Sequence, residues 1–409
     1  MQAFNIQSLI YRKGSSIQAS TRPRFEILDG MRGVAAIIVV IFHIFEIHSK
    51  GPALQIINHG YLAVDFFFAL SGFVIGYAYD DRWKKGLTLG TFFKTRVIRL
   101  QPMMILGVTL GALTYYFGLA QIESTTVKTL LLIWLLSCLL IPVTRQMDIR
   151  GWGEGYALDG PQWTLAFEYI ANILYAVFIR HFSKKMLFLF VILSAFLSID
   201  LSLNLNLFGF LSDRIDERYT MIGGWSLDSS QLYVGFTRLL YPFFVGLLIY
   251  RLGLRIKIKG AFLVCFSILC LTLMMPRVGI GAYEWTNGLY EAFCVIIVFP
   301  LILMIGSGIL ELDARKTKMC NWLGRISYPL YITHYSFIYF LFEWTYKHPD
   351  MPISVQIFNG IAVFLISMGV AYASERLYDI KIREWLKNKF LYKKEPKLPK
   401  LEITHLSPE

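Results

Sequence analysis

About ten apolar windows run through this chain, and each is about 17 to 21 residues long, the length at which a helix crosses a membrane. Windows of this length, in a chain that is 56% hydrophobic, predict an all-α fold, a polytopic membrane bundle of about ten transmembrane helices. They begin near Leu28, Tyr61, Ile98, Trp163, Leu187, Leu232, Ala261, Leu289, Leu323 and Val355.

The charges support a membrane protein rather than a nucleic-acid-binding one. Of 409 residues, 56% are hydrophobic and 17% are charged, far from soluble averages of about 25% charged. The net charge of +12 comes from short basic clusters between the apolar windows, as the positive-inside rule expects of cytoplasmic loops. We therefore expect lipid and no nucleic acid as a partner, an inner-membrane location and both termini in the cytoplasm. The clusters are Arg12–Arg24, Arg82–Arg96, Arg180–Lys185, Arg251–Lys259, Arg315–Lys318 and Lys381–Lys394.

A further apolar run, Val127–Ile141, is too short to cross the membrane. It would extend about 22 Å as a helix, against about 30 Å of hydrocarbon. A full eleventh crossing would also place the two termini on opposite sides. We therefore predict a re-entrant or partial helix that lines a cavity, followed by an external polar segment from Thr144 to Gly160.

The chain divides into a cytoplasmic basic arm (1–24), a membrane domain (25–376) and a cytoplasmic basic tail (377–409). The arm is polar and basic, so we expect no cleavable signal peptide. The tail is expected either to lie on anionic lipid as an amphipathic segment or to extend into solvent. The five cysteines have neither metal-ligand spacing nor a disulfide pattern, so no metal site is predicted.

The first window carries two ionisable residues, Arg32 and His43. Their eleven-residue separation places both on one stripe of a helix, about 16 Å apart along its axis. An ionisable side chain within lipid costs at least about 2.5 kcal/mol and usually faces a cavity, which makes both residues functional candidates. A packed, hydrogen-bonded histidine is the structural alternative for His43.

Two arginines and a carboxylate are expected at the inner face. Arg96 and Arg99 are three residues apart, hence adjacent on a helix, and their planar guanidinium groups suit a phosphate or pyrophosphate. Positive-inside charge alone would also explain them. Glu375 closes the last apolar window among basic residues, where it could brace Arg32, Arg96 or Arg99, or simply end the helix.

Further polar residues are expected in the outer half of the bundle. Asp65 lies about one turn into the second window, where it could also be a helix-start acid. Glu168, Arg238 and Glu291 fall near the outer ends of their windows, and a structural salt bridge among them is an alternative to function. His334 is placed at mid-membrane.

Five segments of the chain form a recognisable set: Leu28–Gly33 with His43, Gly60–Ile75, Phe92–Pro102, Trp163–Glu168 and Leu323–His334. In this order they resemble the acyltransferase 3 family of membrane O-acyltransferases, which includes bacterial O-acetyltransferases of surface polysaccharides. The resemblance covers about residues 25–376. Ala63, Thr164 and Leu100 depart from the family pattern, and the proline that often follows the last glutamate is missing after Glu375.

The resemblance implies transfer of an acyl group, usually acetyl, from cytoplasmic acyl-coenzyme A to a hydroxyl of a cell-surface glycan or similar acceptor. It assigns essential roles to five residues of the inner face and first helix: Arg32, His43, Arg96, Arg99 and Glu375. His43 would be the general base, oriented by Glu46, or would itself carry the acyl group.

The remaining candidates are expected to assist. Asp65, Glu168 and Arg238 would bind the acceptor or shape its site. Ser327, Tyr328, Tyr331 and His334 would polarise the thioester carbonyl or line the path of the pantetheine arm. A transporter with a charged relay, or a carrier that only moves acetyl groups, remains an alternative, although no internal repeat supports the former. The acceptor and the oligomeric state stay open.

Overall fold

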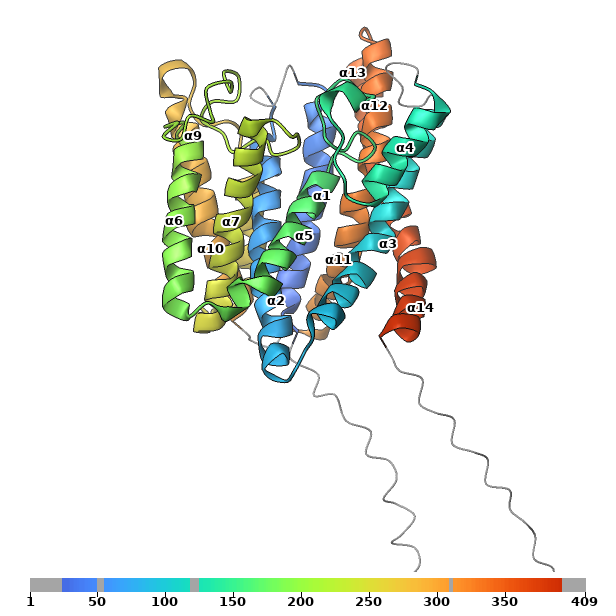
Figure 1. The fold of residues 1–409 in the computed structure, drawn as a ribbon. Helices are drawn as coiled ribbons and strands as arrows, with labels where there is room; N and C mark the ends of the chain where they lie inside the picture. Colours follow the sequence, from blue (N-terminus) through green and yellow to red (C-terminus); the bar gives the residue numbers. More distant parts are fainter. Residues whose placement is uncertain (1–23, 50–54, 118–124, 309–311, 392–409) are drawn as a thin grey trace, which may run out of the picture.

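A computed structural model describes residues 24–49, 55–117, 125–308 and 312–391, and all regular structure within these ranges is helical. Most of the expected basic arm (1–23) and the end of the expected tail (392–409) lie outside the described residues. The described chain begins and ends at the lower end of a bundle of roughly parallel helices (Figure 1).

The first half of the bundle begins with α1 and runs through α6. The 3-10 segment Asn58–Leu62 leads directly into α2. The bounds are α1 Glu26–Glu46, α2 Ala63–Lys84, α3 Leu89–Tyr116, α4 Val127–Cys138, α5 Gln162–Val177 and α6 Lys184–Ser202.

The second half contains two helices that continue through a π-helical segment. Cys294–Val298 joins α9 to α10, and Glu375–Asp379 joins α13 to α14, so the expected domain boundary at Arg376 falls within continuous helix. The bounds are α7 Ser229–Leu252, α8 Ala261–Met274, α9 Trp285–Phe293, α10 Phe299–Gly306, α11 Ala314–Thr333, α12 Tyr335–Lys347, α13 Ile353–Ser374 and α14 Ile380–Phe390.

Seven helical segments of the described chain are long and apolar enough to cross a membrane. This is a multi-pass membrane protein, although ten crossings stay a prediction. The other expected spans fall short for identifiable reasons: α5 has 16 residues, α8 has 14, and α11 carries Arg315, Lys316, Lys318 and Arg325. The seven segments are Glu26–Glu46, Asn58–Lys84, Leu89–Tyr116, Lys184–Ser202, Ser229–Leu252, Gly281–Gly306 and Ile353–Phe390.

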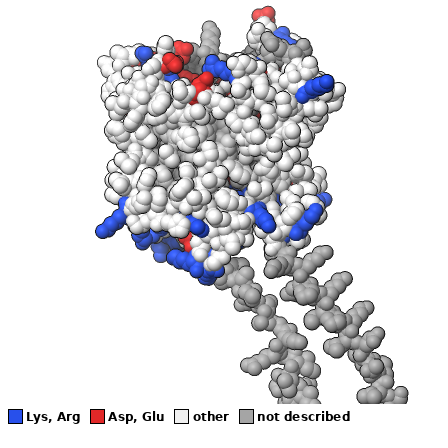
Figure 2. All heavy atoms as spheres, in the orientation of Figure 1, with Lys and Arg blue, Asp and Glu red and all other residues white. Residues whose placement is uncertain are grey.

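The charged side chains visible on one face of the molecule lie mainly at the two ends of the bundle. On the face drawn in Figure 2, Lys and Arg gather at the lower end, and most visible Asp and Glu lie at the upper end. A broad band without charge separates them, as lipid contact requires.

The short helix α4 has 12 residues, or about 18 Å of helix, and packs beside the upper part of α3 (Figure 1). The chain then folds back into the protein. The buried side chain of Gln162, at the start of α5, donates to the Ser137 carbonyl near the end of α4. Consequently α5 begins inside the bundle.

Helices α1 and α11 cross closely because glycines line their contact. A Cβ atom at Gly33 would lie 2.5 Å from the Leu323 carbonyl oxygen, and one at Gly30 would lie 2.8 Å from Cys320 Sγ. From the other side, a Cβ atom at Gly324 would lie 2.8 Å from Asp29 Cβ. Small residues allow this approach of two membrane helices, and it fixes the position of the stripe that carries Arg32 and His43.

A fully buried ion pair fastens α2 to α7. Arg238 Nη2 lies 2.7 Å from Asp65 Oδ2, and the two side chains are 1% and 0% exposed. Arg238 also donates to the carbonyl oxygens of Tyr61 (2.7 Å) and Gly223 (3.0 Å). The pair therefore joins both helices to the loop that precedes α7.

We expect Arg238→Met to destabilise the protein strongly, because it leaves the Asp65 carboxylate buried without its partner, a change that costs about 3–5 kcal/mol. The measurement is thermal unfolding of the purified protein in detergent. The double variant Asp65→Asn/Arg238→Met removes both charges and should recover part of the loss. A single variant that unfolds at the wild-type temperature would contradict the role of this pair.

Candidate functional site

Two cavities lie along the stripe that joins Arg32 to His43. The upper cavity has a volume of about 300 Å³ and contains His43, and the lower has a volume of about 700 Å³ and contains Arg32. Val64 and Tyr331 line both cavities, so these side chains separate the two spaces. Because the two cavities adjoin, they suit an elongated ligand that extends from the lower cavity towards the upper one.

The orientation of His43 is fixed by Glu46, one turn further along α1. His43 Nδ1 lies 2.8 Å from Glu46 Oε2, which confirms the expected contact. The ring of Tyr335 meets the His43 ring edge-on, with ring centres 4.9 Å apart. With its Nδ1 proton donated to the carboxylate, His43 presents Nε2 as a base or nucleophile.

His334 packs beside His43 but lines neither cavity. Its Nδ1 lies 3.0 Å from the carbonyl oxygens of Leu330 and Tyr331, so this nitrogen carries the proton. Nε2 is buried, has no hydrogen-bond partner among the described residues, and holds a lone pair. In this tautomer His334 cannot donate to a thioester carbonyl. Tyr331, by contrast, lines both cavities.

Six arginines line the lower cavity, and the three predicted from the sequence, Arg32, Arg96 and Arg99, differ in their pairing. Arg32 donates to Ser327 Oγ (2.8 Å) and to the Gly324 carbonyl (2.6 Å) across the α1–α11 contact. Arg96, which is buried, forms an ion pair with Glu168, which is 24% exposed. Arg99 lines the same cavity without a hydrogen bond or ion pair to any residue in the described ranges. Its guanidinium is therefore the one of the three best placed to bind an added anion.

The structure places Glu168 in the lower cavity, which corrects its expected position in the outer half with Asp65 and Arg238. The physical reason is that α5 begins inside the bundle, after the chain has folded back from α4. Arg238 lines the upper cavity, and Asp65 lines neither. Glu168, Arg238 and Glu291 form no ion pair with one another, so the salt bridge considered among them does not occur.

Glu375 lies at the lower cavity, at the start of the π-helical segment between α13 and α14. Its carboxylate is 3.6 Å from Arg325 Nε and 3.3 Å from Arg376 Nε. It forms no ion pair with Arg32, Arg96 or Arg99, so the expected bracing of those arginines is not seen.

The upper cavity contains a glutamate that the sequence analysis did not select. Glu154 Oε2 accepts a hydrogen bond of 2.6 Å from the Tyr339 hydroxyl, and burial raises the pKa of Glu154 to about 7. Asp148 holds this loop by accepting from the backbone N–H groups of Arg150 and Gly153. The surrounding walls are largely aromatic: Phe42, Tyr61, Trp152, Trp163, Trp225, Tyr335 and Phe342.

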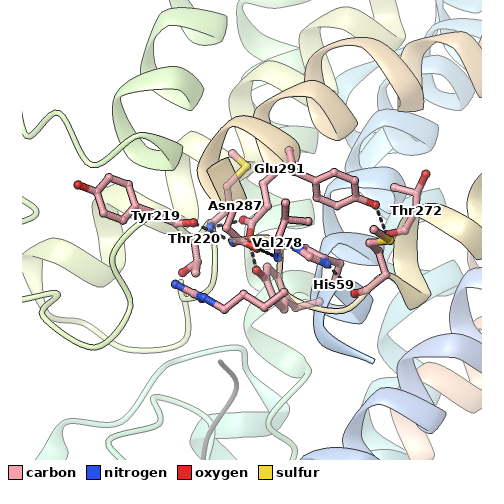
Figure 3. Close-up of polar contacts among 12 residues, drawn as sticks. His59, Tyr219, Thr220, Thr272, Val278, Asn287 and Glu291 are labelled. Carbon is pink, nitrogen blue, oxygen red and sulfur yellow. Dashed lines mark hydrogen bonds and ion pairs between the residues drawn. The ribbon is translucent and has the colours of Figure 1, made fainter. Parts of the chain in front are cut away.

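A separate polar cluster lies at the upper end of α9 (Figure 3). Glu291 accepts hydrogen bonds from Asn287 Nδ2 (2.6 Å), the Met221 backbone (2.6 Å) and the Tyr61 hydroxyl. His59 Nδ1 lies 2.7 Å from the Met275 carbonyl. Glu291 lines neither cavity and ties the loops together around α9.

Among the residues that the structure describes, no group of three or more His, Cys, Asp or Glu side chains is arranged to hold a metal ion.

Comparison with known proteins identifies the family. The model of the acyltransferase 3 family, described as an acyltransferase domain, matches residues 25–375. The chain belongs to the acyltransferase 3 family. It is also 34% identical over 164 residues to "Protein 2 in picA locus" of Rhizobium radiobacter, an alignment covering 37% of this chain and 81% of that protein. No solved structure matches the chain.

The raised pKa of Glu154 predicts a pH-dependent difference in stability. Its native pKa is about 7 and its ordinary value is 4.5, so the folded state retains a proton that the unfolded state releases between these values. Glu154 therefore contributes stability to the folded protein below pH 4.5, and this contribution is lost as the pH rises through about 7.

The Glu154→Gln variant lacks this titration. We expect the melting temperature of the wild type to fall relative to that of Glu154→Gln between about pH 5 and pH 8. Glu343→Gln, which alters a carboxylate paired with Lys347 on α12, is the matched control and should not show this trend. A constant difference between wild type and Glu154→Gln would contradict the raised pKa.

Proposed function

We propose that this membrane acyltransferase moves an acyl group, most simply acetyl, from cytoplasmic acyl-coenzyme A to a hydroxyl of a cell-surface glycan. The observation that carries the proposal is the pair of adjoining cavities: one contains several arginines, the other contains His43, and Tyr331 borders both. Family membership supports the acyltransferase chemistry, and the cavities suggest where donor and acceptor bind.

The lower cavity suits the phosphates of coenzyme A. Guanidinium groups bind phosphate through paired, charge-assisted hydrogen bonds, and Arg99 has no competing partner among the described side chains. The arm between the pyrophosphate and the thioester is comparable in length to the helical distance of about 16 Å from Arg32 to His43. Arg99 lines the same cavity as Arg32, so a donor with its phosphates near these two arginines would bring its thioester towards His43.

The upper cavity suits a sugar. Its aromatic walls can pack against the apolar faces of a sugar ring, while Glu46, Glu154 and Arg238 are polar groups that can orient hydroxyls. We propose that Glu154 and Arg238 contact the acceptor directly. Asp65 contributes indirectly, by holding Arg238 in place.

The proposed reaction is direct acyl transfer. His43 Nε2 removes the proton of the acceptor hydroxyl, and the oxygen attacks the thioester carbonyl carbon. The new C–O bond forms, the C–S bond breaks, and the departing thiolate receives the proton from the His43 imidazolium. Glu46 stabilises the imidazolium through Nδ1. In the alternative sequence His43 Nε2 is first acylated and then passes the group to the acceptor.

The orientation follows from the distribution of charge. We infer that the lower end, where Lys and Arg gather, faces the cytoplasm and that both termini lie there. The membrane is then the inner membrane. Ten crossings, with α4 entering and leaving from the outer side, are consistent with the order of the helices in Figure 1.

His43→Ala should abolish acyl transfer, because loss of a general base lowers the rate by about 10²- to 10⁴-fold. The measurement uses membranes containing the protein, acetyl-coenzyme A labelled in the acetyl group, and the cell-envelope glycan fraction as acceptor. His348→Ala, which changes an exposed histidine stacked on Trp344, is the matched control and should keep full activity. Retained transfer by a normally accumulating His43→Ala protein would refute the proposed role.

Arg99→Gln should raise the KM for acetyl-coenzyme A about tenfold, because it removes one charged hydrogen-bond donor to phosphate. The value of kcat should change less, since the residue lies far from the reacting atoms. Lys94→Gln is the control: it removes a charge from the exposed face of the same helix without altering the cavity. An equal rise in KM in both variants would indicate a general effect of the lost positive charge and would contradict a specific phosphate contact by Arg99.

A further inference from the structure

Helix α14 is a wall of the lower cavity. Asp379, Ile380, Arg383 and Lys387 line that cavity, and the charged members recur at intervals of four residues, which places them on one helical stripe. The apolar side chains Trp385 and Phe390 are not part of the cavity wall and are 55% and 51% exposed. The helix also packs against α3, which carries Arg96 and Arg99. The charged residues of this stripe thus face a cavity inside the protein, which binding of the tail to lipid does not explain.

The stripe formed by Asp379, Arg383 and Lys387 leads from the side of α3, which carries Arg96 and Arg99, towards the lower end of the bundle. Asp379 and Arg99 line the same cavity. Arg383 and Lys387 follow one and two helical turns later, about 6 and 12 Å further along the axis. Figure 1 shows that α14 descends to the lower end of the bundle.

The two basic residues of the stripe differ in their pairing. Asp379 accepts both the Nε–H and an Nη2–H of Arg383, with 2.6 Å between Nε and Oδ1, so this carboxylate orients the guanidinium. Lys387 forms no hydrogen bond or ion pair with any described residue. An oriented arginine followed one turn later by an unpaired lysine fits a phosphate monoester, whose charge is near −2 at neutral pH.

We propose that Arg383 and Lys387 on α14 bind a terminal phosphate monoester of the donor, namely the 3′-phosphate on the ribose of coenzyme A. This subsite rests on the proposed function, because it assumes that the pyrophosphate of coenzyme A lies near Arg99. The 3′-phosphate then lies further from the thioester than the pyrophosphate, on the side where the stripe continues.

The test compares coenzyme A with 3′-dephospho-coenzyme A, which lacks only this phosphate. Binding of each to the purified full-length protein in neutral detergent is measured by isothermal titration calorimetry. We expect the wild type to bind coenzyme A about five- to tenfold more tightly, the effect of one exposed charge-assisted contact. In Lys387→Ala this preference should nearly vanish, while the affinity for 3′-dephospho-coenzyme A stays unchanged.

Lys389→Ala is the matched control. Lys389 has the same charge on the same helix, but its Nζ lies 4.8 Å from the ring centre of Trp385 and the residue does not line the cavity. This variant should keep the wild-type preference, and Lys387→Arg should keep most of it. The preference of the wild type should also decrease as salt is added.

Four outcomes would overturn the proposal, and the last of them would also contradict the proposed function. Equal binding of the two nucleotides by the wild type would show that no group recognises the 3′-phosphate. Equal weakening of both by Lys387→Ala would indicate a structural or general electrostatic effect. If Lys387→Ala instead weakens only binding to nanodiscs that contain anionic lipid, the stripe recognises a lipid headgroup. Failure of the folded wild type to bind either nucleotide would contradict the proposed donor itself.

Discussion

The close crossing of α1 and α11 determines how the rest of the site is arranged. Glycines at Gly30, Gly33 and Gly324 let the two helices approach, and Arg32 reinforces the contact by donating to the Gly324 carbonyl and Ser327. A larger side chain at Gly33 would meet the backbone of Leu323 and push the helices apart. The crossing therefore sets where Arg32 and His43 stand relative to the cavities, and it brings Tyr331 of α11 to their shared border.

Each cavity has a physical environment that matches one part of the proposed reaction. Several arginines line the lower cavity, and one of them, Arg96, pairs with Glu168. In the upper cavity, aromatic walls surround His43 and two glutamates, and the buried Asp65–Arg238 pair holds one side of that space. Separation by only a few side chains would let the thioester reach His43 while the charged phosphates stay near the arginines.

Much of the fold could be predicted because lipid imposes a length and a composition on each helix. The same reasoning correctly limited Val127–Ile141 to a short helix, observed as Val127–Cys138. The expectation that this helix lines a cavity was not met, because none of its residues lines the upper or the lower cavity. The depth of Glu168 could not be predicted, since it depends on a tertiary hydrogen bond between Gln162 and Ser137. Glu154 was missed because it lies in a loop without periodicity. The role of α14 as a cavity wall was missed because hydropathy does not reveal which helices α14 packs against.

The account depends most on the claim that one donor passes from the lower cavity towards His43. A cryo-electron microscopy structure of the wild-type protein with bound acetyl-coenzyme A tests this claim most directly. The account predicts the nucleotide in the lower cavity beside Arg99, with the thioester extending past Tyr331 towards His43 Nε2. A nucleotide bound in the upper cavity, or a thioester directed away from His43, would contradict it.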